Sequence, residues 1–311
     1  MNFILSEQVD ADNISSLDWD LAIVASGFER RGSHLVRKLG ISAGKKLAFA
    51  FSNRRCHSRD FNDRVFANSG FRLIEEDGDH GERIQDELMQ FVKRFKGSDL
   101  RILVDYSCMT REWYASIINF FRRLESFNSC VEIFFSYSHA VFRSPSSGSP
   151  NSHVGAIDGF STITLPRLPT ALVIGLGNEP NRCLGIKEYI DPAETFLFYT
   201  DPCVDPQFRR SIKSANRLLF ELTPQDRVYT YPADGIQRAS ALLTSLTAGL
   251  REKYRLILAP LGPKPFSLLC LLVAMRLRDV EVWRITSGQL SDPVDQAAIG
   301  QITVLRVVFV P

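Results

Sequence analysis

The chain has 311 residues, of which 45% are hydrophobic and 23% are charged, with a formal net charge of +2. This length suits two domains of ordinary size, and the composition is that of a folded globular protein, not of a disordered one. The nearly balanced charge argues against generic nucleic-acid binding and against a polybasic membrane-binding surface.

The ends and the apolar segments of the chain predict its compartment. The first twenty residues lack a basic segment and contain acidic residues from Glu7 onward, so we expect no signal peptide. The longest apolar run, Phe266 to Met275, is shorter than the ~20 residues that span a bilayer and predicts a buried helix. Six scattered cysteines without a CxxC motif indicate free thiols. We therefore expect a cytoplasmic protein without membrane contact.

The two halves of the chain resemble each other. The apolar run LAIVA at 21–25 leads into SGFERR, and ALVI at 171–174 leads into GLGNEPNR, so that Gly27 aligns with Gly177. Three further strand-like segments match in the same order and at nearly constant spacing: 46–53 with 195–201, 100–105 with 254–259, and 131–138 with 280–287. Such a series of matches indicates an internal duplication.

Short apolar runs alternate with amphipathic stretches in each half, which indicates parallel strands joined by crossover helices. The segment Glu82 to Lys96 has the apolar spacing of one helix face. We therefore predict an α/β protein of two tandem Rossmann-like domains, each a mainly parallel sheet with helices on both faces. The predicted domains are residues 1–145 and 168–311, joined by a linker over 146–167 that includes the segment SPSSGSPNS.

The loops that follow the first strand of each half are the first candidate ligand-binding segments, because ligands bind at the carboxyl ends of parallel strands. They carry Gly27, Glu29, Arg30 and Arg31 in one half and Gly177, Glu179 and Arg182 in the other. Glycines allow close approach of a ligand, and carboxylates accept hydrogen bonds from sugar hydroxyls or base amino groups. Two alternatives stay open: the glycines only form tight turns, and the glutamates only form salt bridges that hold the loops.

A second pair of loops, DYSCMTREW at 105–113 and PLGPKPF at 260–266, contributes the candidates Ser107, Thr110, Arg111, Gly262 and Lys264. Thr110 is suited to cap the following helix. A cation at a helix N-terminus opposes the helix dipole, so Arg111 and Lys264 suggest an anion bound beside them. The alternative is that both side chains point into solvent.

These second loops also resemble a known family. LVDYSCMTREW resembles the strand-loop-helix signature of CARF domains, the Rossmann-like sensors of CRISPR-linked defence, and LAPLGPKPFSL is similar to a divergent form of it. Two CARF-like units in one chain resemble SAVED domains, which sense cyclic oligonucleotides in anti-phage systems. The resemblance implies a sensor that binds a cyclic oligonucleotide or related nucleotide second messenger in the cleft between the domains. It also implies a partner effector protein in anti-phage defence.

Two other classes of function stay open. One is an enzyme that uses the same cleft, either a ring-nuclease-type phosphodiesterase or a nucleotide-dependent transferase, and the other is a non-catalytic interaction subunit of a defence complex. We predict no catalytic residue, cofactor or metal site, because the histidines lack metal-ligand spacing and no nucleophile and base can be paired from the sequence.

Overall fold

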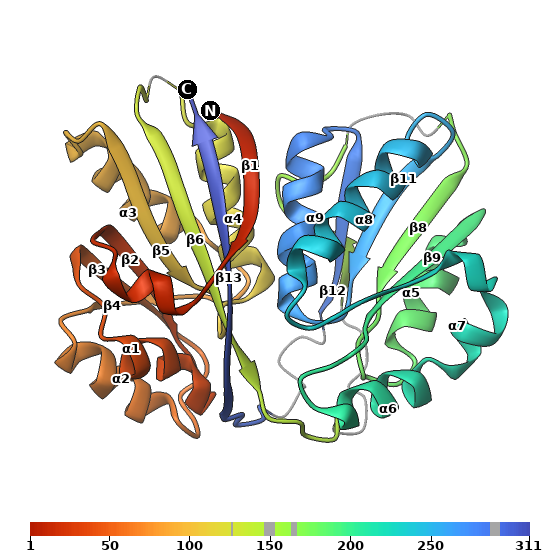
Figure 1. Cartoon of the computed structure of the whole chain (residues 1–311), viewed down its shortest axis with the longest axis horizontal. Coiled ribbons are helices and arrows are strands. Elements are labelled where there is room, and N and C mark those ends of the chain that lie inside the picture. Colours follow the sequence, from red (N-terminus) through yellow and green to blue (C-terminus); the bar gives the residue numbers. More distant parts are fainter. Residues whose placement is uncertain (126, 146–152, 163–166, 287–292) are drawn as a thin grey trace. The chain divides into compact units, whose positions relative to one another are not determined.

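The chain forms two compact units, of which the computed structural model describes residues 1–125, 127–145, 153–162, 167–286 and 293–311. Unit 1 comprises Met1–Val141 and Pro293–Pro311, and unit 2 comprises Phe142–Asp292. Each unit has its own mainly parallel sheet with helices packed on it (Figure 1). Residues 146–152, which hold most of the predicted Pro/Ser/Gly-rich linker segment, lie outside the described residues.

Unit 1 is built on a seven-stranded sheet in the order β1-β13-β6-β5-β2-β3-β4. Its strands are β1 (Asn2–Val9), β2 (Trp19–Ser26), β3 (Ala43–Phe51), β4 (Arg72–Glu76), β5 (Asp99–Asp105), β6 (Cys130–Ala140) and β13 (Ala298–Val310). Its helices are η1 (Asp12–Ser16), η2 (Arg30–Ser33), α1 (His34–Leu39), α2 (Arg59–Asn68), α3 (Glu82–Arg94) and α4 (Arg111–Arg123). The antiparallel pair β1 and β13 brings the two chain ends side by side (Figure 1).

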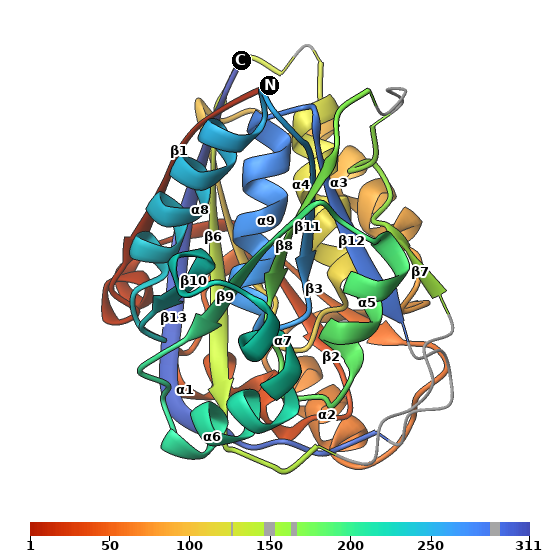
Figure 2. The ribbon, with the colours of Figure 1, turned by 90° about the vertical axis from the view of Figure 1, so that its right-hand side faces the viewer.

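Unit 2 has a six-stranded sheet in the order β10-β9-β8-β11-β12-β7. Its strands are β7 (His153–Ala156), β8 (Thr170–Gly175), β9 (Glu194–Thr200), β10 (Val228–Tyr231), β11 (Arg255–Pro260) and β12 (Val280–Thr286). Its helices are α5 (Arg182–Ile190), α6 (Pro206–Ala215), α7 (Arg217–Leu222), η3 (Gln225–Arg227), α8 (Ile236–Leu250) and α9 (Lys264–Arg276). Figure 2 shows α5 and α7 in front of the strands of this unit.

The five parallel strands have the same order in both units, β4-β3-β2-β5-β6 and β10-β9-β8-β11-β12. Their central register also agrees, because Ala22 lies opposite Leu103 in unit 1 and Leu172 lies opposite Ile257 in unit 2. This is the order of doubly wound, Rossmann-like sheets, in which ligands bind where the direction of winding reverses. That point lies between β2 and β5 in unit 1 and between β8 and β11 in unit 2.

Apolar side chains on both faces of each sheet explain the helical layers. In unit 1 one face carries Ala22, Val24 and Leu103 against Leu35 of α1 and Phe66 of α2. In unit 2 the corresponding face packs on residues of α5, α6 and α7, such as Ile186, Ile212 and Leu219. The opposite faces are covered by the helix pairs α3 with α4 and α8 with α9 (Figure 1). The strands covered on both faces therefore consist largely of apolar residues.

Two helices predicted from apolar spacing are confirmed. The segment predicted over Glu82 to Lys96 forms α3, which buries Ile84, Leu88 and Val92 along one face. The apolar run from Phe266 to Met275 forms most of α9 and is buried in its entirety. Among the described residues, no helix has the length and apolar character needed to cross a membrane.

The last strand corrects the predicted domain boundary. We expected residues 168–311 to form the second domain, but the contacts place 293–311 in unit 1, where β13 lies between β1 and β6. Its side chains Val304, Leu305, Val307 and Phe309 are buried there. Without β13, the long strand β6 would present an unpaired edge, which folded proteins avoid. The C-terminal segment therefore completes the sheet of the N-terminal unit.

This arrangement makes unit 1 dependent on the end of the chain. In a chain shortened to end at Asp292, we expect amide hydrogens in 2–9 and 131–140 to exchange at least about tenfold faster, because both strands lose their pairing with β13. The strands of unit 2 provide the internal control and should keep their protection. Hydrogen exchange measured by mass spectrometry checks this, and equal protection of β1 and β6 in both proteins would contradict it.

Candidate functional site

A buried asparagine holds the loop after β2. The Nδ2 group of Asn62, on α2, donates to the carbonyl oxygens of Gly27 at 2.9 Å and Glu29 at 2.8 Å. Its Oδ1 atom accepts a hydrogen bond of 2.8 Å from the hydroxyl of Ser33. Because Asn62 is fully buried, these bonds satisfy a side chain that water does not reach, together with the buried Gly27 carbonyl.

In unit 2 a buried asparagine also binds the corresponding loop. The Nδ2 group of Asn216 donates to the carbonyl oxygen of Gly177 at 2.8 Å, and Asn216 is buried as well. Our sequence analysis missed both asparagines, although a signal was present. Asn62 to Phe66 reads NDRVF and Asn216 to Phe220 reads NRLLF, so asparagine and phenylalanine recur at the same spacing after the second strand of each half.

The predicted glutamates and arginines of these loops form ion pairs with each other. In unit 1, Arg31 Nε lies 2.6 Å from Glu29 Oε2, and the Nη1 group of Arg31 donates to the Tyr137 hydroxyl at 3.0 Å and to the Ser138 carbonyl at 2.9 Å. Burial by itself would lower the pKa of Arg31, but its electrostatic interactions with Tyr137 and Glu29 outweigh burial and raise that pKa well above its usual range. Arg31 is therefore a charged group inside the fold, with its hydrogen bonds directed to the end of β6.

In unit 2, Arg182 pairs with Glu179 and also donates from Nη2 to the carbonyl oxygen of Ile285 at 3.0 Å. In each unit, a glutamate-arginine pair thus connects the loop after the first parallel strand (β2 or β8) to the end of the fifth parallel strand (β6 or β12). The sequence left two roles open for Glu29 and Glu179: ligand binding, or salt bridges that hold the loops. The structure supplies arginine partners for the second role.

The glycines of unit 2 allow two loops to touch. A Cβ atom added to Gly177 would lie 2.4 Å from the carbonyl oxygen of Leu261, and one added to Gly262 would lie 2.5 Å from that of Leu176. The neighbouring backbone also forms a hydrogen bond of 2.9 Å from the Leu261 amide to the Gly175 carbonyl. Close backbone approach, which we expected a ligand to use, is here used by the second loop of the same unit.

The loops of unit 1 meet at Ser138. Its carbonyl accepts from Arg31, and its amide donates to the Ser107 hydroxyl at 2.8 Å. The Ser107 hydroxyl in turn donates to Asp105 Oδ1 at 2.5 Å. Asp105, Ser107 and Ser138 are all buried, so the two predicted loops of this unit share one polar network. Gly27 lies next to the second loop as well, since an added Cβ would lie 3.3 Å from the Cβ of Cys108.

Three buried polar side chains at the strand ends of unit 1 have apolar residues at the aligned positions of unit 2. Where unit 1 has Ser26, Asp105 and Ser107, unit 2 has Leu176, Ala259 and Leu261, and all six side chains are buried. The two units therefore share backbone topology and differ in the chemistry of their strand ends. Polar recognition of a ligand is better supported in unit 1.

The predicted cations occupy equivalent helix positions. Arg111 is the first residue of α4 and Lys264 is the first residue of α9, and both helices have 13 residues. The Thr110 side chain caps α4, as predicted, by accepting the Trp113 amide at 3.3 Å. Both cations are half-buried. The remaining predicted residue, Arg30, is exposed and lies with its guanidinium 4.5 Å from the centre of the Phe61 ring.

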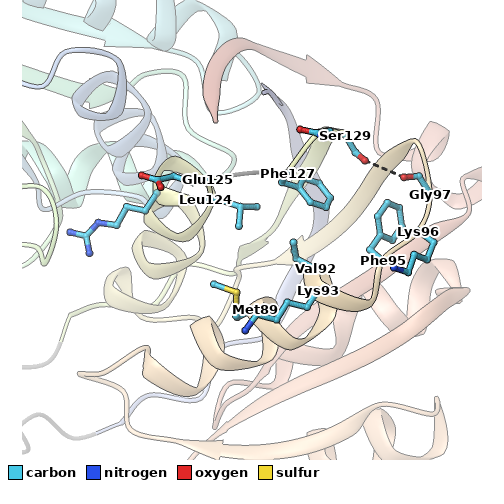
Figure 3. Close-up of a pocket in the computed structure, with 12 residues that line it drawn as sticks. Met89, Val92, Lys93, Phe95, Lys96, Gly97, Leu124, Glu125, Phe127 and Ser129 are labelled. Carbon is cyan, nitrogen blue, oxygen red and sulfur yellow. Dashed lines mark hydrogen bonds between the residues drawn. The ribbon is translucent and has the colours of Figure 1, made fainter.

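A pocket of about 650 Å³ (Figure 3) lies near the start of β5, whereas the predicted loop at 105–113 follows the end of that strand. Apolar residues such as Val92, Leu124 and Phe127 line it, together with Lys93, Lys96 and Arg123. Lys93 and Arg123 lie in the last turns of α3 and α4, where cations complement the helix dipole. No predicted site residue lines this pocket.

Two further kinds of group, the Cys183 thiol and possible metal ligands, bear on the chemistry of the described residues. Burial raises the pKa of the Cys183 thiol, at the start of α5, to about 12, so this thiol is protonated at neutral pH. Across the described ranges, no three or more histidine, cysteine, aspartate or glutamate side chains gather in a group that could hold a metal ion.

No known family model matches this chain, and no curated protein matches it.

The contact between the two loops of unit 2 predicts opposite effects for two glycine substitutions. Gly177→Ala should lower the free energy of unfolding by about 1–3 kcal/mol, because the new methyl group overlaps backbone that cannot move alone. Gly249→Ala, in α8, has no atom within 4 Å of the added Cβ and should raise stability by roughly 0.5–1 kcal/mol. Urea titrations measure both, and equal stability of the two variants would contradict the tight contact.

Proposed function

We propose that the chain is a sensor of a nucleotide second messenger, and that its ligand is a cyclic oligonucleotide bound at the loops after the parallel strands. The observation that carries the proposal is the equivalent placement of Arg111 and Lys264 as the first residues of α4 and α9. A cation is unfavourable at the positive end of a helix dipole, and a phosphate group beside it would offset that cost. In this proposal Arg111 and Lys264 hold phosphates.

An internal duplication is part of the same proposal. It is supported by the common strand order of the two units, the common register of Ala22–Leu103 and Leu172–Ile257, and the asparagine bonds to Gly27 and Gly177. A repeated scaffold suits a ligand that itself repeats, such as a cyclic chain of identical nucleotides. The resemblance of the second loops to CARF signatures supports the same ligand class, and a partner effector in anti-phage defence would then carry the response.

The ion pairs that Glu29 and Glu179 form with arginines favour a sensor over an enzyme. Hydrolysis of a phosphodiester needs a group that accepts the proton of the attacking water or ribose hydroxyl. Glu29 and Glu179, the acidic residues repeated in the first loops, are both paired with arginines that tie them to the scaffold. The proposed role of the loops is therefore to present backbone and cationic groups to a ligand that stays intact.

The cations can be tested with matched variants of the same helices. Arg111→Ala and Lys264→Ala should each weaken binding of a cyclic oligoadenylate by about 1.5–3 kcal/mol, the usual worth of a charge-assisted hydrogen bond. Arg123→Ala and Arg276→Ala remove the same charge from the exposed last residues of α4 and α9 and should leave affinity unchanged. Isothermal titration measures all four. Equal weakening of binding in all four variants, or no weakening in any of them, would refute phosphate contacts at Arg111 and Lys264.

The fate of the ligand separates the sensor from its rivals. Purified protein incubated for hours with cyclic oligoadenylates should bind at least one of them and return it uncleaved, as chromatography of the nucleotides would reveal. Linear products that disappear in Glu29→Gln or Glu179→Gln would replace the sensor with a ring nuclease. Neither binding nor cleavage of any cyclic nucleotide would instead favour the interaction subunit.

A further inference from the structure

A segment that the sequence analysis left unassigned, Pro293 to Ala297, lies on the first loop of unit 1. The Asp295 carboxylate accepts the Arg30 amide at 2.6 Å and the Ser58 hydroxyl at 2.7 Å. The next residue adds a backbone bond of 3.0 Å from the Arg31 amide to the Gln296 carbonyl. The segment that leads from unit 2 back into β13 is thus fastened to the loop that the proposed ligand would use.

The loop after β3 takes part in the same contact. The His57 ring nitrogen Nε2 lies 2.9 Å from the carbonyl oxygen of Pro293, and the Ser58 amide donates to the Phe28 carbonyl at 3.1 Å. Three segments that are far apart in the sequence therefore meet around the Asp295 carboxylate: the loop after β2, the loop after β3 and residues 293–297.

The groups that surround Asp295 suit an anion. Two donors, a backbone amide and a hydroxyl, point at its oxygens. Arg30 follows β2, and Arg54 and Arg55 follow β3, where Arg55 is paired with Asp60 and Asp63. A phosphate group presents the same acceptor oxygens as a carboxylate, with a larger charge, and would satisfy the same donors. The Asp295 carboxylate thus occupies a position that would also suit a phosphate group of the proposed ligand.

We propose that Asp295 is an autoinhibitory latch: its carboxylate closes the first loop of unit 1, and a phosphate group of the nucleotide ligand competes with it for the Arg30 amide and the Ser58 hydroxyl. This regulation rests on the proposed function, because it concerns access to the same site. The latched and liganded states exclude each other. The measured association constant is therefore the intrinsic association constant multiplied by the fraction of molecules in which the latch is open.

The latch can be tested first without a ligand. In Asp295→Ala, the amide hydrogens of Arg30 and Arg31 should exchange about tenfold faster than in the wild type, because the carboxylate that holds the segment in place is gone. Ser58→Ala, which removes one of the two donors, should have a smaller effect in the same direction and serves if the first variant does not fold. The matched control is Gln296→Ala, since that residue contributes its backbone carbonyl.

Binding of cyclic oligoadenylates to the same proteins then tests the competition. Asp295→Ala should bind about tenfold more tightly than the wild type, and Gln296→Ala should bind like the wild type. Equal or weaker binding by Asp295→Ala, when the wild type binds, would overturn the latch and leave the sensor proposal intact. Absence of binding by every protein would overturn the sensor and the regulatory role together, whereas unchanged exchange at Arg30 and Arg31 would refute the closing contact itself.

Discussion

The structure depends on how each unit satisfies the backbone where its first parallel strand ends. Beyond that point the carbonyl group of Gly27 is buried and that of Gly177 is partly buried, and a buried asparagine donates to each of them. An unpaired buried carbonyl would cost on the order of 1–3 kcal/mol. Because Asn62 and Asn216 come from the helical segments that follow the second strand, this bond also sets the distance between the loop and the helix layer. The position of every candidate ligand group on the loop follows from it.

The two units share the order of their parallel strands and differ in the chemistry of their strand ends. In unit 2 the loops after β8 and β11 pack backbone against backbone, at glycines that leave no room for a Cβ. In unit 1 the corresponding space holds Asp105 and Ser107, which bond to each other and to the end of β6. Buried polar groups are costly unless each is bonded, and the hydrogen bonds among Asp105, Ser107 and Ser138 offset part of that cost. Unit 2 keeps a cation at the start of α9 and otherwise has the more apolar strand ends.

The sequence predicted the features that depend on neighbouring residues and did not predict those that depend on distant ones. The strands, the helix over Glu82 to Arg94, the buried helix α9 and the equivalent starts of α4 and α9 depend on patterns within a few residues. The strand β13 and the contact between Arg30 and Asp295 depend on segments more than 260 residues apart, for which one sequence holds no pairing signal. The similarity between the two halves of the sequence related the loops of one half to those of the other, but it held no information on β13, which has no counterpart in the aligned segments.

The stability of β13 confines any opening of the latch to a short segment. The strand β13 pairs with β1 over Val304–Val310 and with β6 over Ile302–Phe309, and its pairing with β6 is irregular between Ala298 and Ile302. Gly300 lies in this irregular part with a φ of +105°, a conformation that other residues rarely adopt, and an added Cβ there would meet no atom within 4 Å. Rotation at Gly300 would move residues 293–299 without breaking the ladder beyond Ile302, at the cost of the pairing of Ala298 with Ala140 and of the hydrogen bond from the Val141 amide to the Ala297 carbonyl. Because a few hydrogen bonds hold the segment while a whole ladder holds the strand, local opening needs far less free energy than loss of the sheet. The same glycine that interrupts the ladder thus lets the first loop open while unit 1 stays folded.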